Sequence, residues 1–465
     1  MSNKTTIGTK CHVYDGPHAT PTKTEQGPVY LGIDTITDDG HINQAEYSHL
    51  SDIDYKTWTK RVTPQYGDLV FSYEATLGRY ALIPEGFHGC LGRRLAVVRP
   101  KDNQINIRWL YYYFLSPEWK VFIANHTVKG STVNRISVDD FPQYPIPLLD
   151  RSEQDRIVCV LGTIDEKIAL NKRINAELEA LAKTIYDYWF VQFDFPDENG
   201  KPYRTSGGAM EYNDQLKRKI PKGWKATKLK DVVSISGQAT IAGEHLKDML
   251  YTPIDEIPKR SMSFFGGLPY GKANSSLQLY KRGDILLGAM RVYFHRVCIA
   301  AQNGITRSTT IILKPNDKTQ LPFAFEVLNM DRTIQYATKI SVGTQQPYVN
   351  WEGALDSYLI AMPSDDRLID CYSEKVQPII DTVMGKAQEN YELTRLRDWL
   401  LPMLMNGQAT VTDEQPTETR QNVVEMLNKD ERFDLWLQNQ GIAARGNLDR
   451  KTLREIFDAM DDDDK

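Results

Sequence analysis

The chain has 465 residues, of which 25% are charged and 41% hydrophobic, with a net charge of −5 and a sequence pI of about 6.0. This length favours two or three domains, and the composition is that of a soluble globular protein. The charge balance argues against a protein that coats nucleic acid by bulk positive charge, although local basic patches remain compatible with it.

The sequence also predicts a compartment. No apolar run reaches the roughly 18 residues that a membrane span requires, and the opening MSNKTTIGTK lacks the apolar core of a signal peptide. Five cysteines lie far apart, an odd and scattered set that favours reduced thiols over a disulfide framework. They are Cys11, Cys90, Cys159, Cys298 and Cys371. We therefore expect a cytoplasmic protein with no membrane partner.

Residues 1–150 are predicted to form a globule that mixes helices and strands. Short apolar runs at 68–73 and 95–98 are bounded by Gly, Pro and Asn, which is typical of strands, and 107–113 is typical of a helix. A polar run, KGSTVNR at 129–135, precedes a proline-spaced segment. Gly, Ser and Asn are common in turns, so this run by itself predicts only a turn.

Residues 151–193 are predicted to form a long helix. Asp150 and Glu153 have the spacing of a capping box. Apolar residues then recur at steps of three and four on a narrow stripe, which suits a coiled-coil seam better than a globular core. Asn171 and Asn175 interrupt the stripe near its middle.

The second half has the same plan. Residues 194–222 have the Pro, Gly and polar content of a linker, and 223–363 predict a second globule. A distal helix over 364–407 opens near Ser364, with Pro378 expected to kink it or to mark a late start. Residues 408–465 form a tail that is partly helical, and the final DDDDK is either native or a vector-derived cleavage sequence.

The two halves resemble one another in sequence. Five short segments return in the same order: YLGIDTI at 30–36 as YTPIDEI at 251–257, Gly67-Asp68 as Gly283-Asp284, LAVVRP at 95–100 as TIILKP at 310–315, Gly130-Ser-Thr as Gly343-Thr-Gln, and a long helix ending in Trp189 or Trp399. This order predicts two copies of one module. An internal two-fold axis would pair the two helices antiparallel, with the two globules at opposite ends and inverted.

Motifs for catalysis and metal binding are weak. Residues 266–272 have the spacing of a phosphate-binding loop, but Ala273 follows where Ser or Thr is needed for magnesium. The eight histidines lack metal-ligand spacing, and Asp165-Glu166-Lys167 is better explained as a solvated helix face than as a nuclease site. We therefore predict no catalytic and no metal-binding residues in this chain.

Polar and basic positions that recur between the halves are predicted to contact DNA, because such side chains bind phosphates and base edges. Arg79 and Arg291 each follow a Gly-Asp turn, and Arg93 with Arg94 is matched by Arg307 with Ser308. The two glycine loops supply the others. These are Lys129, Ser131, Thr132, Asn134 and Arg135 in the first half and Thr344, Gln345 and Gln346 in the second.

These residues resemble a known family. The segments SEQDRI at 152–157, IDEKI at 164–168, NKRIN at 171–175 and YWFVQF at 188–193 are similar to the central region of specificity subunits of type I restriction–modification systems. NGKPY at 199–203, IPKGW at 220–224 and LLPML at 400–404 extend the likeness, which covers about 12–407.

The resemblance implies an α+β fold, in which two pseudo-two-fold related target recognition domains are separated by two long antiparallel coiled-coil helices. Each domain would read one half of a bipartite double-stranded DNA target, and the helices would set the spacer. Two methyltransferase subunits would dock on this chain, and motor–nuclease subunits would join through them. S-adenosylmethionine, ATP and Mg would belong to those partners, and no cofactor to this chain.

Two other classes remain open from the residues. The chain could be a coiled-coil scaffold that binds only proteins, or a nuclease whose site has no recognised motif. Failure to bind any DNA at low salt would favour the scaffold, and magnesium-dependent cleavage by the chain alone would favour the nuclease.

Overall fold

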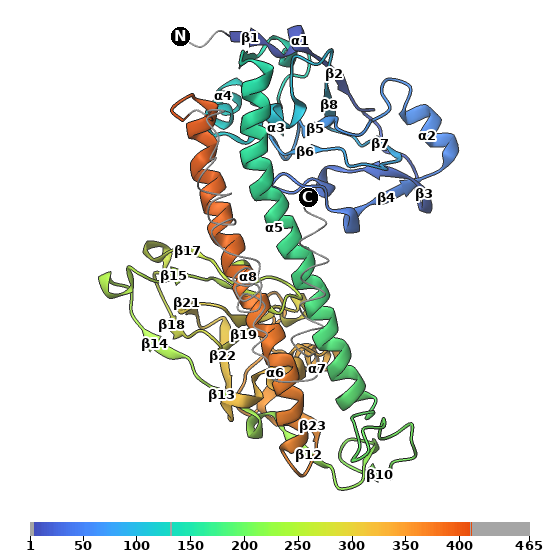
Figure 1. Cartoon of the computed structure of the whole chain (residues 1–465), viewed down its shortest axis with the longest axis vertical. Coiled ribbons are helices and arrows are strands. Elements are labelled where there is room, and N and C mark those ends of the chain that lie inside the picture. The colour runs from blue at the N-terminus through green and yellow to red at the C-terminus, as the bar shows by residue number, and fades with distance from the viewer. Residues whose placement is uncertain (1–3, 131–132, 410, 412–465) are drawn as a thin grey trace, which may run out of the picture. The chain divides into compact units, whose positions relative to one another are not determined.

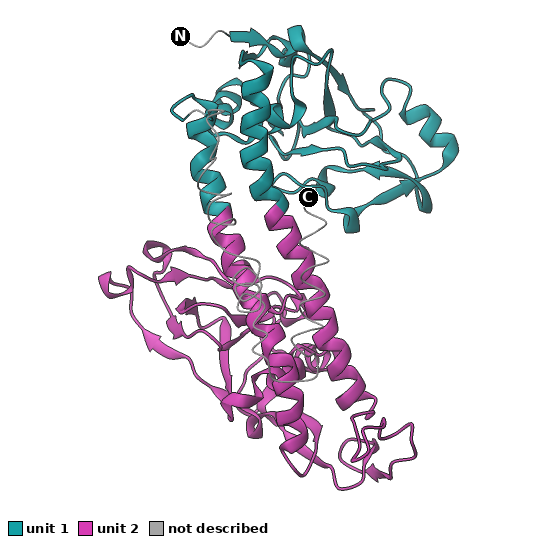
Figure 2. Cartoon of the chain, in the orientation of Figure 1, with its two compact units in different colours: residues 1–166, 394–415 teal, residues 167–393, 416–465 magenta. Residues whose placement is uncertain are grey.

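The computed structural model describes residues 4–130, 133–409 and 411, and the chain divides into two compact units (Figure 2). The first unit joins Met1–Glu166 to Thr394–Gln415, and the second joins Lys167–Leu393 to Pro416–Lys465. Both units combine helices with small, mostly antiparallel sheets. The chain therefore has the α+β fold that the sequence predicts.

The first unit is built on a four-stranded antiparallel sheet with the order β2-β8-β5-β6. Its strands are β2 (Cys11–Asp15), β5 (Leu69–Ser72), β6 (Tyr80–Leu82) and β8 (Leu95–Pro100). A second sheet places β3 between β4 and β7, with β3 and β7 parallel. The remaining strands are β1 (Lys4–Thr6), β3 (Lys23–Leu31), β4 (Ser48–Leu50), β7 (Gly89–Leu91) and β9 (Pro145–Pro147), and β1 pairs with β9.

Four short helices complete the first unit: α1 (Ile7–Lys10), α2 (Asp52–Trp58), α3 (Ile107–Leu115) and α4 (Pro117–His126). Ser116 ends α3 and caps α4, because its hydroxyl accepts a hydrogen bond from the Trp119 N–H at 3.3 Å. The buried rings of Phe114 and Trp119 stack 4.3 Å apart, so α3 and α4 share one aromatic core.

The second unit has two five-stranded sheets, with the orders β13-β22-β19-β20-β16 and β14-β18-β21-β15-β17. Strands of the first sheet are β13 (Val233–Ile235), β16 (Ser263–Phe264), β19 (Ile285–Gly288), β20 (Val297–Ala300) and β22 (Thr310–Pro315). Strands of the second are β14 (Gln238–Thr240), β15 (Leu250–Tyr251), β17 (Leu268–Pro269), β18 (Leu277–Tyr280) and β21 (Gly304–Arg307). The unit also has α6 (Leu321–Asn329) and α7 (Asp331–Ile340), and a pair formed by β12 (Lys225–Lys228) and β23 (Leu359–Met362).

The strand pairing confirms the internal repeat. β2-β8-β5-β6 of the first unit has the same order and antiparallel sense as β13-β22-β19-β20 of the second. The parallel pairing between β3 and β7 in the first unit recurs between β15 and β21 in the second and again brings a tyrosine, Tyr30 or Tyr251, into register. Each unit is therefore one copy of the same module.

The long helices are α5 (Arg151–Tyr186) and α8 (Arg367–Met405), and Figure 1 shows them running side by side. In the first unit, Leu401 and Leu404 near the end of α8 share a core with Ile157 and Leu161 near the start of α5. In the second unit, Asn171 on α5 donates to Glu389 and Asn390 on α8, and Asn175, further along α5, donates at 3.3 Å to the carbonyl of Val383, which comes earlier in α8. The helices therefore pair antiparallel in each unit, as predicted.

Two expectations about these helices need correction. Pro378 marks no late start, because α8 begins at Arg367 and is assigned as helix through Pro378 to Met405. Five residues of α-helix at the end of the predicted first helix are replaced by a π-helical turn over Asp187–Val191. Buried Trp189 and Phe190 lie in this turn, where they pack into the core of the second unit.

Residues 194–222, expected to be a linker, are folded onto the second unit. They contain the hairpin of β10 (Met210–Asn213) and β11 (Arg218–Pro221). Asp194 accepts hydrogen bonds from the N–H and the hydroxyl of Thr205, both at 2.7 Å. The Phe195 ring stacks between the rings of Tyr203 and Trp224, at 4.7 and 5.4 Å. The Pro, Gly and polar residues of this segment therefore form turns of a folded segment and not a flexible linker.

Among the described residues, no helix combines the length and the apolar character needed to cross a membrane. Of the tail predicted over 408–465, the structure describes only 408, 409 and 411, so its expected helices and DDDDK lie outside the described residues.

Candidate nucleic-acid interface

The glycine loop of the first unit is a hairpin that follows α4. Val128 and Arg135 close it with two main-chain hydrogen bonds of 2.8 and 3.1 Å. Arg135 also forms a bridge with Glu74, and the next residue, buried Ile136, donates to the Tyr73 carbonyl at 2.7 Å. The base of the loop is therefore anchored to the end of β5, and the described residues Lys129, Gly130 and Asn134 within it are exposed.

The glycine loop of the second unit is attached in the same way. Val342 and Tyr348 close it with two main-chain hydrogen bonds of 2.9 Å, and Tyr348 forms a bridge with Met290. Buried Val349 donates to the Ala289 carbonyl at 3.0 Å, as Ile136 does to Tyr73. The two loops are equivalent parts of the repeat, and the loop of the first unit is longer by one residue between its closing positions.

Glycine is required in each loop for a local reason. A Cβ at Gly130 would lie 2.2 Å from the Val133 carbonyl oxygen, closer than any side chain tolerates. Gly343 has a φ of +98°, a conformation that other residues rarely adopt. The glycines therefore shape the loops, and their neighbours are left to make contacts.

The predicted contact residues of the loops are exposed where the structure describes them: Lys129, Asn134 and Arg135 in the first unit and Thr344, Gln345 and Gln346 in the second. Ser131 and Thr132 lie outside the described residues. The two loops thus present different side chains, a cationic set in the first unit and an uncharged amide set in the second, on one backbone plan.

The predicted correspondence between Arg79 and Arg291 is wrong. Arg79 corresponds to Arg296, because each lies opposite the end of the central strand and accepts the same main-chain bond, from Ser72 or Gly288. Arg79 Nη1 donates to the Ile36 carbonyl at 3.0 Å, and Arg296 Nη1 donates to the equivalent Ile257 carbonyl. Distance from the Gly-Asp turn does not identify the equivalent arginine, because the chain between the turn and the arginine follows a different path in the two units.

Arg291 instead corresponds to Ala75, and both have left-handed φ values, of 50° and 67°. The Arg291 N–H donates to the Pro347 carbonyl at 2.7 Å, and its Nη2 lies 3.4 Å from the Gln345 carbonyl oxygen. Arg291 therefore supports the second loop from its base, next to the predicted contact residues.

The remaining predicted residues lie just before the strand that pairs with the anchoring strand of each loop, β8 in the first unit and β22 in the second. Arg94 Nε lies 3.0 Å from Glu74 Oε1, and Glu74 in turn bridges to Arg135, so Arg94 belongs to the base of the first loop. Arg93 is exposed. In the second unit, Arg307 and Ser308 are exposed, and Arg307 Nη2 lies 3.4 Å from Ser275 Oγ.

Sequence reasoning missed three exposed aromatic residues near the second loop. Tyr348 closes the loop and is 47% exposed, and Tyr293 and Phe294 follow Arg291 and are 50% and 37% exposed. The Lys259 ammonium lies 4.6 Å from the centre of the Phe294 ring. The dipeptide Tyr293-Phe294 could have been recognised in the sequence, since adjacent aromatic residues outside a strand pattern are candidates for exposed contacts.

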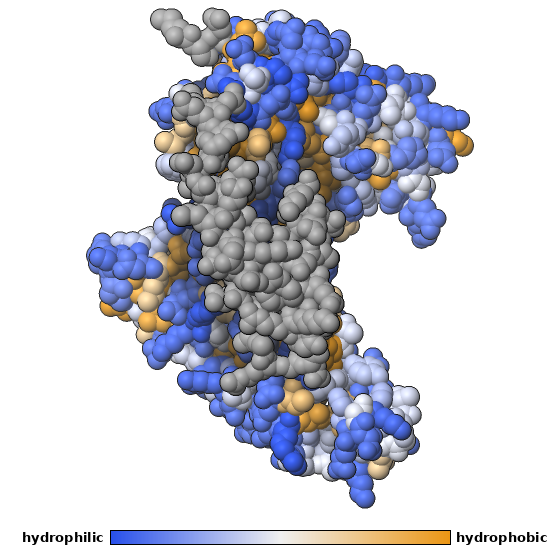
Figure 3. All heavy atoms as spheres, viewed as in Figure 1, coloured by the Kyte–Doolittle hydropathy of each residue, from blue (hydrophilic) through white to orange (hydrophobic). Residues whose placement is uncertain are grey.

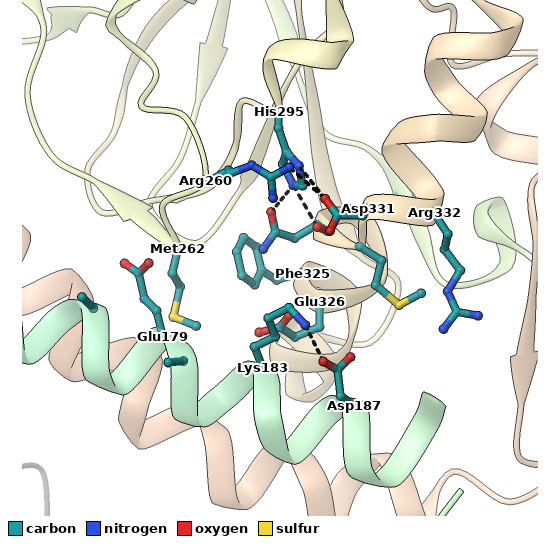
Figure 4. Close-up of a pocket in the computed structure, with 14 residues that line it drawn as sticks. Glu179, Lys183, Asp187, Arg260, Met262, His295, Phe325, Glu326, Asp331 and Arg332 are labelled. Atoms are coloured by element: carbon teal, nitrogen blue, oxygen red, sulfur yellow. Dashed lines mark hydrogen bonds and ion pairs between the residues drawn. The ribbon is translucent and has the colours of Figure 1, made fainter. Parts of the chain in front are cut away.

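A charged cavity of about 400 Å³ lies elsewhere in the second unit, between α5 and α6 (Figure 4). Most of its charges neutralise one another: Lys183 pairs with Asp187, and Arg260 Nη2 lies 3.0 Å from Asp331 Oδ1. Glu326 is buried at its edge, and burial raises the pKa of this carboxyl to about 8. The cavity is therefore close to electrically neutral at neutral pH.

Metal ligands do not gather in the part of the chain that the structure describes: no three His, Cys, Asp or Glu side chains come together there. On the face seen in Figure 3, both units are mostly hydrophilic, and apolar residues form only small groups.

Comparison with known proteins gives a consistent result. The family model of the type I restriction modification DNA specificity domain matches residues 33–180. The MjaIX type I restriction enzyme specificity subunit of Methanocaldococcus jannaschii is 24% identical over 375 residues, which cover 77% of this chain and 81% of that protein. The HindI specificity subunit of Haemophilus influenzae is 20% identical over 399 residues, which cover 74% and 86%.

Solved structures are also similar to this chain. The S subunit of a type I restriction-modification system from M. genitalium has a TM-score of 0.48 and 13% identity, over 88% of this chain and 96% of that one. The HsdS subunit from Thermoanaerobacter tengcongensis has a TM-score of 0.31 and 17% identity, over 88% and 97%.

Proposed function

We propose, from the premise that this chain belongs to the family of type I restriction–modification DNA specificity subunits, that its two recognition domains read the two halves of one bipartite DNA target. A specificity subunit is a non-catalytic component of its complex. Chemistry on DNA then belongs to other subunits, and this chain determines where the chemistry happens.

The observation that carries this proposal is the pair of loops at 128–135 and 342–348. Both are closed by the same main-chain bonds and anchored to the same strand of the repeat, yet their exposed side chains differ. Amide side chains such as Gln345 and Gln346 can read base edges, and cations such as Lys129 and Arg135 can bind phosphates. One scaffold with two different contact sets suits a target whose halves differ.

Double-stranded DNA and the other subunits of the system are the partners of a specificity subunit. We further propose that two methyltransferase subunits dock on this chain and that motor–nuclease subunits join through them. S-adenosylmethionine, ATP and Mg would bind to those subunits. The antiparallel helices α5 and α8 would set the number of base pairs between the half-sites.

The decisive experiment combines the purified full chain with its methyltransferase subunit and maps methylated adenines on genomic DNA. We expect methylation only at a split sequence and only when this chain is present. A matched control replaces the exposed residues of both loops by glycine and serine. Equal methylation of unrelated duplexes by the native complex would contradict the proposal.

Two further outcomes separate the other classes. Failure to bind any DNA at low salt, even with the methyltransferase subunit, would favour a protein scaffold, because contacts with DNA phosphates are strongest at low salt. Magnesium-dependent cleavage of DNA by this chain alone would favour a nuclease.

A further inference from the structure

A second cavity of the second unit, of about 440 Å³, is lined by two arginines from different elements. Arg218 comes from β11 and Arg332 from the first turn of α7. Aromatic side chains make up much of the remaining wall, among them Tyr186 and Tyr336. A cavity with an apolar floor and two guanidinium groups is suited to an anion.

Neither arginine has an acidic partner among the described residues. The Arg218 guanidinium stacks 5.1 Å from the centre of the Phe193 ring. Arg332 forms no hydrogen bond or ion pair with any residue that the structure describes, and Figure 4 shows its guanidinium pointing away from Asp331, which faces Arg260. Arg291 and Arg296, the other half-buried arginines of this unit, both have oxygen partners.

The two charges affect one another. Burial, and after it the charge of Arg332, lowers the pKa of the Arg218 guanidinium. Like charges that are withdrawn from water without a counter-ion are unfavourable, so an anion between them would be bound with a gain in free energy.

The repeat itself does not require this arrangement. α4 is the counterpart of α7 in the first unit, and the position equivalent to Arg332 is occupied there by Glu118. An arginine at this position is therefore not required to build the module.

Phosphate is the anion that fits best. Two guanidinium forks offer more donors and more charge than one carboxylate uses, whereas a phosphate group has oxygens for both. Arg332, Tyr336 and Lys339 follow at steps of four and three along α7, which places them on one face of the helix. α7 leads directly into the loop at 342–348, about 15 Å from Arg332 at ~1.5 Å per residue.

We infer that Arg218 and Arg332 form a phosphate-binding site, and that its ligand is a phosphodiester of the DNA that flanks the half-site read by the second unit. The identity of the DNA ligand rests on the proposed function, whereas the phosphate site does not. Free phosphate is the alternative source of the same chemistry.

The first arm of the test measures thermal unfolding of the full chain in inorganic phosphate and in chloride at equal ionic strength. We expect phosphate to raise the Tm of the native chain, and Arg332→Gln to raise the phosphate concentration needed by about tenfold or more. Arg332→Lys should retain part of the effect. Arg173→Gln, which removes an exposed arginine of α5, is the matched control.

The second arm measures DNA binding by the complex with the methyltransferase subunit. Arg332→Gln should weaken binding on all sequences and reduce the slope of log K against log salt by about one, with the preferred sequence unchanged. Ethylation interference should lose one phosphate outside the second half-site. Arg218→Gln repeats the test, and Arg332→Gln remains informative if Arg218→Gln fails to fold.

The outcomes are distinct. A phosphate effect on Tm without an effect on DNA binding would overturn the DNA ligand and leave a free-phosphate site. No phosphate effect in either arm would overturn the site, even if the native complex still recognises its target. A phosphate effect in a chain that binds no DNA would sink the proposed function and leave the phosphate site standing.

Discussion

Arg79 and Arg296 show that an arginine predicted from its sequence context to face a ligand can also bond the main chain of its own unit. Each donates to the carbonyl of an equivalent buried isoleucine, Ile36 or Ile257, and so holds the chain beside the central strand. An arginine that bonds a main-chain carbonyl satisfies a group that would otherwise be buried unpaired. Contact between Arg79 and DNA stays a prediction, while its structural contact is observed.

Gln345 provides the clearest residue-level prediction. We expect Gln345→Ala to relax the sequence preference at one position of one half-site, with a loss of about 1–3 kcal/mol if the amide contacts a base. The measurement is the affinity of the complex for a panel of duplexes with single substitutions.

Gln388→Ala on α8 is the matched control, since this amide bonds Glu392 within its own helix at 3.0 Å. Lys129→Ala should differ from both, weakening binding to every duplex because a phosphate contact carries no sequence information. Equal losses on all duplexes for Gln345→Ala would assign Gln345 to a phosphate as well.

Glu326 makes the stability of the second unit depend on pH. Its pKa is about 8 in the folded chain against 4.5 for the free group, so the folded state keeps a proton that the unfolded state has lost. Stability should therefore be highest near pH 5, fall as pH rises toward 8, and level off above that. Gln carries no such proton, so Glu326→Gln should gain stability relative to the native chain across this range.

Urea unfolding of both chains at about pH 5.5 and 8.5 measures the effect. Glu177→Gln, at an exposed position of α5, is the control and should leave the pH profile unchanged. Parallel profiles for the native chain and Glu326→Gln would show that Glu326 is ionised in the fold.

At the scale of elements, polar side chains hold the middle of the helix pair. Asn171 is fully buried in the second unit, where its Nδ2 donates to Glu389 Oε2 at 2.8 Å and to Asn390 Oδ1 at 3.0 Å. In the first unit, Asp165 accepts from Arg397 at 3.0 Å and from the Tyr112 hydroxyl at 2.7 Å. Asn171, one of the two asparagines that interrupt the apolar stripe, is therefore a partnered group, which favours one register.

Length of the helices should determine the spacer. We expect insertion of seven residues after Leu170 and of seven residues at the facing position of α8 to lengthen the spacer by about three base pairs, at ~1.5 Å per residue and ~3.4 Å per base pair. Mapping of methylated adenines checks this. The control inserts the same residues after Gly407, which should leave the spacer unchanged, and an unchanged spacer in the helix variant would contradict the role of the helices.

At the scale of the whole molecule, the two units share topology but differ in surface. The first has a longer, more cationic loop, and the second has exposed amides, exposed aromatic residues and the arginine cavity. Each unit has its own buried core, so its contacts can change without loss of the other unit.

Exchange of residues 12–150 for the matching segment of another family member should therefore change one half-site and leave the other half-site and the spacer intact. Genome-wide mapping of methylated adenines is the measurement. Exchange of residues 223–363 is the reciprocal control and should change only the other half. A change in both halves after either exchange would show that the domains do not read independently.

The sequence by itself determined the repeat, the two long helices and their antiparallel pairing, because these follow from local signals: turn glycines, periodic apolar residues and the order of segments. It also identified the loops, since glycine at a fixed place before a helix is visible in the chain. Only the tertiary structure decided which arginines face solvent, because Arg79 and Arg296 are separated from their carbonyl partners by about 40 residues. The sequence likewise does not predict that Arg218 and Arg332 line one cavity, because the approach of distant segments depends on packing and not on spacing along the chain.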